Sequence, residues 1–462
     1  MALLGEIILA DLKKTVKYSS TKNYYLIGYF ILVFLGCFNV LRTATFLGPF
    51  VDEIVSLTTS YSFFTSLNFD ASNLDPIFKG NFKGSLSTGP FSALGSAVGW
   101  FVSKDLIVSR VSNFIWIHAL QIFIAIYLSK LFELDRYLFL ITSYLAILIQ
   151  PWWFGTLYSL GETFSTLILF FGLTLFTKKR NLSFLIIGFA VWFGKDIHLL
   201  SFCGFYTYIL FKERNLRQIF KDSINFLFPL FLWLTLVFFK YDGTVAEWFV
   251  EFYNFKIVNN QSVSSVFENK NLIDTILNNF KYSEINTWGI ADFLRTLIFP
   301  LICIYIFLNK NLIKDHTLRN IVNPLFVSTL PIFIWFWLLS STKWIRYSQT
   351  FVLLLLLCLA FLISQKKDFQ LIELAIFYFC FGLFISSSIL FITYNIFFIG
   401  LFINKSSKYF LGLIKIFIIF VFCLSLYSSY EEVNSKEIRY FQFEYCVNNL
   451  NSRDCFNEYM NS

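Results

Sequence analysis

The sequence YYLIGYFILVFLGCFNVLRTATFLGPFVDEIVS (Tyr24–Ser56) joins a long apolar run to a pair of acids. The run, Tyr24–Ala44, is long enough to cross a lipid bilayer as a helix. Asp52 and Glu53 follow within a few residues, although only 14% of the residues in the chain are charged. Acids at such a boundary often only cap or solvate a helix end, but they can also carry out chemistry at headgroup level. The pattern predicts a membrane span and leaves both interpretations of the acids open.

The rest of the chain repeats this apolar pattern. Of its 462 residues, 57% are hydrophobic and 21% are aromatic, far above an ordinary soluble domain. We therefore expect an all-α polytopic integral membrane protein with a bundle of roughly thirteen transmembrane helices. The candidate spans are Tyr24–Ala44, Arg110–Lys130, Tyr137–Trp153, Leu157–Phe176, Leu182–Phe193, Ile197–Phe211, Ile224–Phe239, Ala291–Leu308, Ile321–Leu339, Gln349–Ile363, Leu371–Ser387, Leu390–Ile403 and Tyr409–Leu426.

The charge pattern predicts which side of the membrane each segment faces. The net charge of +8 comes from lysines and arginines spread over short segments, with no dense stripe that would suit a nucleic acid. Such basic segments are typically cytoplasmic. Counting from a cytoplasmic N-terminal segment, residues 1–22, through a transmembrane domain, residues 23–428, leaves the tail, residues 429–462, outside. The basic segments are then all cytoplasmic: Lys178–Arg180, Lys212–Lys221, Lys310–Arg319, Lys366–Lys367 and Lys405–Lys408.

Two long segments, residues 46–109 and 241–290, are placed on the outer face by the same count. In the first, the apolar piece Pro90–Val102 is too short for an unassisted span. We expect it to form a juxtamembrane or re-entrant helix packed on the bundle. Because the cytoplasmic segments are short, a functional site is expected on the outer face.

Two groups of ionisable residues lie on that face. The first outer segment holds Asp70, Asp75, Lys79 and Lys83 besides the acidic pair, and Arg110 stands where the next span begins. The second group, Lys195, Asp196 and His198, lies at a later outer turn. Ionisable residues within a membrane are costly and are often functional. Lys195 and Asp196 can nevertheless form a structural ion pair instead of contacting a substrate phosphate.

These features together resemble the GT-C glycosyltransferases. The shared elements are an Asp-Glu pair after the first span, juxtamembrane helices in the first outer loop, Gly89-Pro90 before the last of them, and Arg110 opening the second span. Within this superfamily the chain looks like the protein O-mannosyltransferases and the lipid A aminoarabinose transferases. The sequence YSLGET (Tyr158–Thr163) places Glu162 where these enzymes often have an acid, and WIRY (Trp344–Tyr347) is similar to their Arg-Tyr element.

The resemblance implies transfer of a sugar from a polyprenyl-phosphate donor to a glycan, lipid or protein acceptor outside the cytoplasm. A carboxylate would take the proton of the acceptor hydroxyl, and cations would stabilise the phosphate leaving group. We expect a carboxylate of the acidic pair to be the base, Asp52 first and Glu53 second. Neighbouring helical side chains point about 100° apart, so one acid is expected to act as base and the other to position a sugar hydroxyl, a cation or the loop. The expected phosphate-binding residues are Arg110, Lys83, Arg346 and Lys195, and the expected substrate-positioning residues are Glu162, Tyr347, Asp196 and His198.

The sequence gives little indication of a cofactor. His118 and His316 have no partner at ligand spacing, so a histidine-based metal site is not expected. A divalent cation held by carboxylates stays open. The chain has neither a Walker loop nor GxGxxG before a helix, which argues against a nucleotide donor. The expected location is the bacterial inner membrane, where the protein is surrounded by lipids and its site faces away from the cytoplasm.

Other interpretations remain. A polysaccharide or O-antigen polymerase would use residues 241–290 as its large outer loop. A flippase or secondary transporter would concentrate ionisable residues near the bilayer midplane, whereas here they gather at helix ends, which favours the transferase. In the tail, Cys446 and Cys455 either form a disulfide in an oxidising compartment or remain two free thiols.

Overall fold

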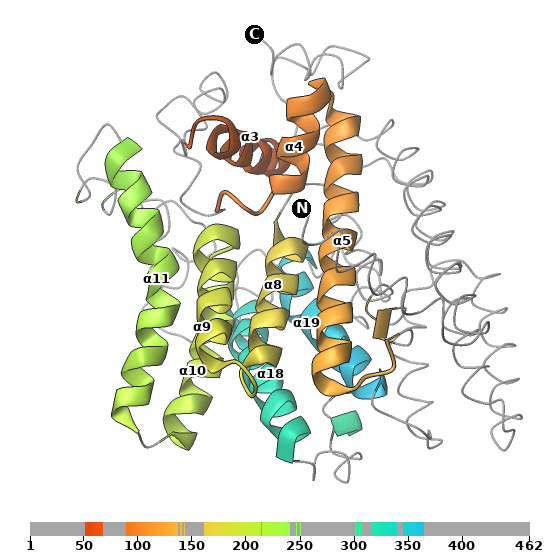
Figure 1. The fold of residues 1–462 in the computed structure, drawn as a ribbon, viewed down its shortest axis with the longest axis vertical. Helices are drawn as coiled ribbons and strands as arrows, with labels where there is room; N and C mark the ends of the chain where they lie inside the picture. The colour runs from red at the N-terminus through yellow and green to blue at the C-terminus, as the bar shows by residue number, and fades with distance from the viewer. Residues whose placement is uncertain are drawn as a thin grey trace, which may run out of the picture.

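The structure is a computed structural model. It describes residues 51–67, 89–136, 139–140, 143, 161–213, 215–240, 246, 250, 301–302, 304–306, 316–339 and 345–364. All regular structure within these ranges is helical, and most of the helices stand side by side as a bundle, with α3 and α4 at one end (Figure 1). The elements are α3 (Val51–Ser66), α4 (Leu94–Ser103), α5 (Leu106–Phe132), α8 (Glu162–Leu175), α9 (Arg180–Phe189), η3 (Ala190–Gly194), α10 (His198–Lys212), α11 (Leu216–Lys240), α18 (His316–Ile334), η6 (Trp335–Leu339) and α19 (Ile345–Ser364).

Three of the described helical stretches are long and apolar enough to cross a bilayer: Leu106–Phe132, Leu216–Leu236 and Arg319–Leu338. Shorter apolar helices lie beside them, so the membrane character predicted from the sequence is confirmed. The count of about thirteen spans stays a prediction, because several predicted spans, including Tyr24–Ala44 and those after residue 364, lie outside the described residues.

Several helix boundaries differ from the hydropathy-based prediction. The structure begins α8 at Glu162, α18 at His316 and α19 at Ile345, where the predicted spans begin at Leu157, Ile321 and Gln349. Two further differences show a local cause. α5 begins at Leu106, four residues before the predicted start at Arg110, because the Asp105 carboxylate caps it by accepting hydrogen bonds from the amides of Ile107 and Val108. α11 begins at Leu216 and not at Ile224, so residues 216–221 of the predicted basic segment Lys212–Lys221 are helical. In α11 the polar residues of the first turns continue a membrane helix beyond its apolar part, whereas α5 starts earlier because its cap lies before an apolar first turn.

The short apolar piece Pro90–Val102 contains helix α4, as predicted, and α4 packs against α5. Glycines on α4 make this packing close. A Cβ on Gly99 would lie 2.8 Å from the Cα of Ser109, and one on Gly95 would lie 2.9 Å from the Cα of Asn113. Small residues that let two backbones approach are the usual device for packing helices in membranes.

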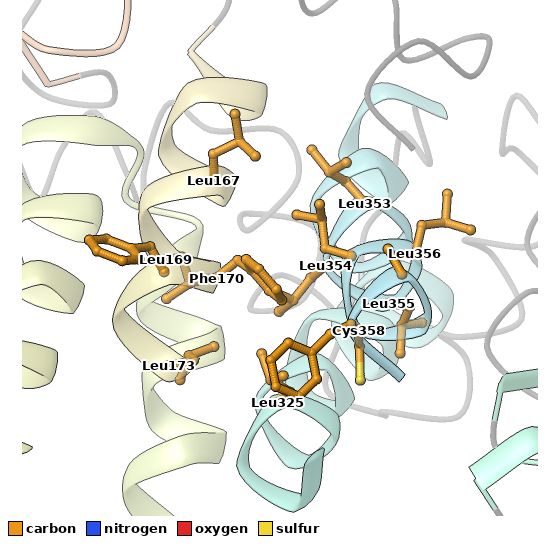
Figure 2. Close-up of a cluster of buried hydrophobic side chains, with 14 of the residues drawn as sticks. Leu167, Leu169, Phe170, Leu173, Leu325, Leu353, Leu354, Leu355, Leu356 and Cys358 are labelled. Atoms are coloured by element: carbon orange, nitrogen blue, oxygen red, sulfur yellow. The ribbon is translucent and has the colours of Figure 1, made fainter. Parts of the chain in front are cut away.

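The core of the bundle lies between α8 and α19. From Phe351 to Ile363 every side chain of α19 is buried, so this helix is apolar and enclosed on all sides. Figure 2 shows Leu353, Leu354 and Cys358 of α19 packed with leucines and Phe170 of α8 and with Leu325 of α18. Because lipid tails are as apolar as leucine, close packing rather than escape from water holds these helices together.

An ion-pair cluster joins α9, α10 and α11 at the end of the bundle opposite to α3 and α4 (Figure 1). Arg180 donates to the Asp222 carboxylate through Nε and Nη2, at 2.9 and 2.6 Å, and to Glu213 through Nη1 at 2.7 Å. The Asp222 side chain is fully buried, whereas those of Arg180 and Glu213 are about a quarter exposed, at 26% and 27%. We call these three residues the Arg180 hub.

The burial of Asp222 predicts unequal effects of two similar substitutions. Asp222→Asn removes the charge that Arg180 pairs with in a buried place, so we expect a loss of about 1.5–3 kcal/mol in the free energy of unfolding. Glu213→Gln removes the same charge from a partly exposed place, and its expected cost is about 0–1 kcal/mol. Thermal unfolding of both variants in detergent tests this. Equal shifts in melting temperature would contradict the role given to Asp222.

Candidate active site

The acid at position 53 is held by an arginine from a distant part of the chain. Glu53 lies in the first turn of α3, and Arg110 lies in the second turn of α5. Arg110 Nε donates to Glu53 Oε1 at 2.9 Å, and Nη2 donates to Oε2 at 2.7 Å. The side chain of Glu53 is 1% exposed and that of Arg110 is 0% exposed. This bidentate geometry is the strongest form of carboxylate recognition by arginine, and it fixes α3 against α5.

Asp52 shares this first helical turn. The structure places its backbone in α3, directly before Glu53, while its side chain lies outside the described residues. Neighbouring positions on a helix are separated by about 100°. The contact between Glu53 and Arg110 therefore sets the direction in which residue 52 leaves the helix.

A second ion pair lies at the start of α8. Lys195 Nζ is 3.3 Å from Glu162 Oε1, and the two side chains are 14% and 3% exposed. Glu162 is the first residue of α8, and Lys195 is the extended residue that ends η3. Glu162 Oε2 is buried and has no hydrogen-bond partner among the described residues. A buried carboxylate oxygen of this kind can accept a hydrogen bond from a ligand hydroxyl.

His198 completes this group at the first residue of α10. Its Nε2 lies 2.8 Å from Ser165 Oγ, and that hydroxyl also lies 2.6 Å from the carbonyl oxygen of Gly161. A hydroxyl has one hydrogen, so if Ser165 donates it to Gly161, Nε2 of His198 must be the donor to Ser165. We therefore assign the proton to Nε2 and a lone pair to Nδ1. Within the described part of the chain, buried Nδ1 has no hydrogen-bond partner.

The segment Gly89–Ala93 links the two ion pairs. The amides of Gly89 and Phe91 donate to the carbonyl oxygens of Gly194 and Phe193, at 2.7 and 2.8 Å. The amide of Ala93 donates to Ser60 Oγ of α3 at 3.1 Å. The segment thus contacts η3, which Lys195 directly follows, and α3, which contains Glu53. Both ion pairs lie at the end of the bundle where α3 and α4 are drawn in Figure 1.

Gly161 makes the contact of this segment with α8 possible. It has a left-handed backbone, with φ of 85°, and an added Cβ would lie 2.4 Å from the Cβ of Ser92. Gly161→Ala should therefore lower stability by about 1–2 kcal/mol through backbone strain, with a steric clash in addition. Adding Ser92→Gly removes the clash and should restore part of the lost melting temperature. A single variant that melts like the wild type would refute this contact.

The structure brings together several of the residues predicted from the sequence. Glu53 pairs with Arg110, and Glu162 pairs with Lys195, near which His198 begins α10. Asp196 is half-buried in the intervening turn. Arg346 and Tyr347 lie in the first turn of α19, but their side chains, and all of Lys83, lie outside the described residues, as do Cys446 and Cys455. The proposed roles of all these residues stay predictions.

Sequence reasoning missed several contributors to the site. Ser165, which orients His198, and Ser60, which holds the backbone of Ala93, were not predicted. The glycine before Glu162 was a usable signal, since glycine is common before a first helical turn. In the described part of the chain no three histidine, cysteine or acidic side chains lie close enough to hold a metal. Whether carboxylates elsewhere in the chain hold a divalent ion stays open.

No protein-family model and no curated protein matches the chain. Solved structures of ArnT from Cupriavidus metallidurans are similar in fold. The crystal structure of ArnT bound to undecaprenyl phosphate has a TM-score of 0.52 and 10% sequence identity, covering 90% of this chain and 79% of ArnT. The crystal structure of ArnT in the apo state has a TM-score of 0.52 and 12% sequence identity, and the match covers 90% of this chain and 78% of ArnT. At these identities the likeness shows the fold alone: the chain described here has a fold like that of ArnT.

Proposed function

We propose that the chain is an integral membrane glycosyltransferase that moves a sugar from a polyprenyl-phosphate donor to an acceptor hydroxyl outside the cytoplasm. The observation that carries the proposal is the position of two buried carboxylate–cation pairs at one end of a GT-C-like bundle. Support also comes from the neighbour ArnT, which was crystallised with undecaprenyl phosphate. The acceptor can be a glycan, a lipid or a protein.

The proposed reaction is a single displacement at the anomeric carbon of the donor sugar. The acceptor oxygen forms a bond to that carbon while the bond from the carbon to the phosphate oxygen breaks. The acceptor proton moves to a carboxylate base, and the bonding electrons leave with polyprenyl phosphate. Because this leaving group is a stabilised anion, cations are needed more than an acid.

We assign the base to Asp52. Both oxygens of Glu53 accept hydrogen bonds from Arg110, so Glu53 and Arg110 are better suited to hold the first turn of α3 than to exchange a proton with substrate. This narrows the two acids favoured by the sequence to one. It also changes the proposed role of Arg110 from binding the donor phosphate to positioning Asp52.

The second ion pair would meet the donor. The Lys195 side chain keeps 14% of its surface exposed while paired, so a phosphate can approach it. Glu162 Oε2 and His198 Nδ1 are buried acceptors, which can bind hydroxyl groups of a sugar. Lys83, Arg346, Tyr347 and Asp196 keep the phosphate-binding and positioning roles that the sequence resemblance implies.

Incubation of the purified chain with candidate polyprenyl-phosphate sugars, scored by release of polyprenyl phosphate, tests the proposal. Release that depends on both the sugar donor and an acceptor is the expected result. Movement of the intact donor across reconstituted vesicles without release would instead identify a flippase. Extension of a polymer linked to polyprenyl diphosphate would identify a polymerase.

A further inference from the structure

The end of the bundle opposite to the candidate active site carries a group of exposed cations. Lys178 and Lys179 precede α9, and Arg217 and Lys221 lie one turn apart at the start of α11. The chain brings them together through the Arg180 hub, in which Arg180 of α9 binds Asp222, the neighbour of Lys221. Figure 1 shows the beginnings of α9 and α11 at this end, away from α3 and α4.

Two acids that adjoin these cations along the chain are already neutralised. Asp222 and Glu213 both pair with Arg180, and Gln218 Nε2 also donates to Asp222 Oδ1 at 2.9 Å. Among the described residues no carboxylate forms a salt bridge with Lys178, Lys179, Arg217 or Lys221, and Lys179 lies over the ring of Tyr127 at 5.4 Å. The surface therefore has an excess of positive charge and needs an anionic partner.

Exposed apolar side chains border the same cations. Phe211 at the end of α10 is 88% exposed, and Leu216 and Phe220 at the start of α11 are 80% and 67% exposed. Along α11 this stripe continues through Ile224, Phe228 and Phe231, all exposed. Such a stripe on a helix that is long and apolar enough to span faces lipid tails. Arg217 and Lys221 follow Leu216 and Phe220 in sequence, which puts them at the edge of the stripe, at headgroup depth.

We propose that Lys178, Lys179, Arg217 and Lys221 form a binding surface for anionic phospholipids. Phosphate headgroups contact the four cations, and the acyl chains of the same lipids lie along Leu216, Phe220 and the rest of the α11 stripe. The expected partner is a lipid and not a free anion, because Arg217 and Lys221 adjoin the apolar stripe of α11. This surface does not depend on the proposed sugar transfer, since it lies at the other end of the bundle.

The test is to titrate phosphatidylglycerol onto the full-length chain in detergent and to measure its binding. Native mass spectrometry counts the lipids retained after titration, and the lipid-induced rise in melting temperature gives an independent readout. The wild type should retain phosphatidylglycerol in preference to phosphatidylcholine. Each cation changed to glutamine should weaken phosphatidylglycerol binding roughly fivefold, because one cation near an anionic surface contributes a factor of that order.

Three controls test whether binding depends on charge, on this surface and on the acyl chains. Lys178→Arg, Lys179→Arg and Lys221→Arg together keep the charge and should bind phosphatidylglycerol as the wild type does. Lys104→Gln removes a cation from the C-terminal end of α4, at the opposite end of the bundle, and should leave retention nearly unchanged. Glycerol phosphate, which lacks acyl chains, should not raise the melting temperature. A variant with all four cations changed to glutamine should lose most of its phosphatidylglycerol retention, and retention equal to the wild type would overturn the proposal. A rise in melting temperature with phosphatidylcholine or glycerol phosphate equal to that with phosphatidylglycerol would overturn it as well.

Discussion

Asp52→Asn should reduce the rate of sugar transfer by a factor of about 100 to 10,000, which is the usual contribution of a general base. The amide keeps the shape of the carboxylate but cannot take the proton of the acceptor hydroxyl. Asp52 lies in the first turn of α3, beside a residue that is clamped to α5. The variant should therefore fold, insert and melt like the wild type, and the loss should fall on turnover rather than on the amount of folded protein.

Asp105→Asn is the matched control for this prediction. Asp105 caps α5, and asparagine caps helices as well as aspartate does. The same chemical change in the same part of the chain should thus leave both stability and transfer near normal. Measured release of polyprenyl phosphate at equal protein concentration compares the two variants. If Asp52→Asn transfers sugar as fast as Asp105→Asn, position 52 is a solvated helix end and another group is the base.

The fold class could be predicted because each membrane helix appears in the sequence as a long run of apolar residues. Hydropathy shows where the hydrocarbon layer begins, but it does not show where a helix begins. α11 starts at Leu216 because its polar first turns contain good helix formers and Asn215 Oδ1 accepts from the amides of Arg217 and Gln218. The capping residue Asp105 was a readable signal for the earlier start of α5.

The candidate site was harder to predict because its contacts join distant segments. Glu53 and Arg110 are 57 positions apart, and nothing local says that their charges neutralise each other. Sequence reasoning therefore gave each of them a separate role toward substrate. Similarly, sequence reasoning considered Lys195 only with its neighbour Asp196, whereas the structure also pairs Lys195 with Glu162. Predictions of sidedness, and of the tail disulfide, stay predictions.

Breaking the pair between Glu53 and Arg110 should have the largest effect on stability. Glu53→Leu leaves a buried guanidinium without its carboxylate, and Arg110→Met leaves a buried carboxylate without its guanidinium. Loss of one partner from a buried ion pair typically costs about 3–5 kcal/mol, which is a large part of the stability of a protein. Unfolding of each purified variant by denaturing detergent, or its thermal melting, measures the loss. Glu162→Gln, which removes a longer and less buried contact, should cost less.

The double variant Glu53→Leu, Arg110→Met separates the cost of an unpaired charge from the contribution of the pair itself. Two apolar side chains of similar volume leave no buried charge at these two positions, so the double variant should regain most of the stability that either single variant loses. Because the pair is proposed to position Asp52 and not to touch substrate, the double variant should also recover sugar transfer in proportion to how well α3 is held. Full stability with no transfer would mean that Glu53 or Arg110 acts on the substrate directly. Single variants as stable as the wild type would mean that the pair does not hold α3 against α5.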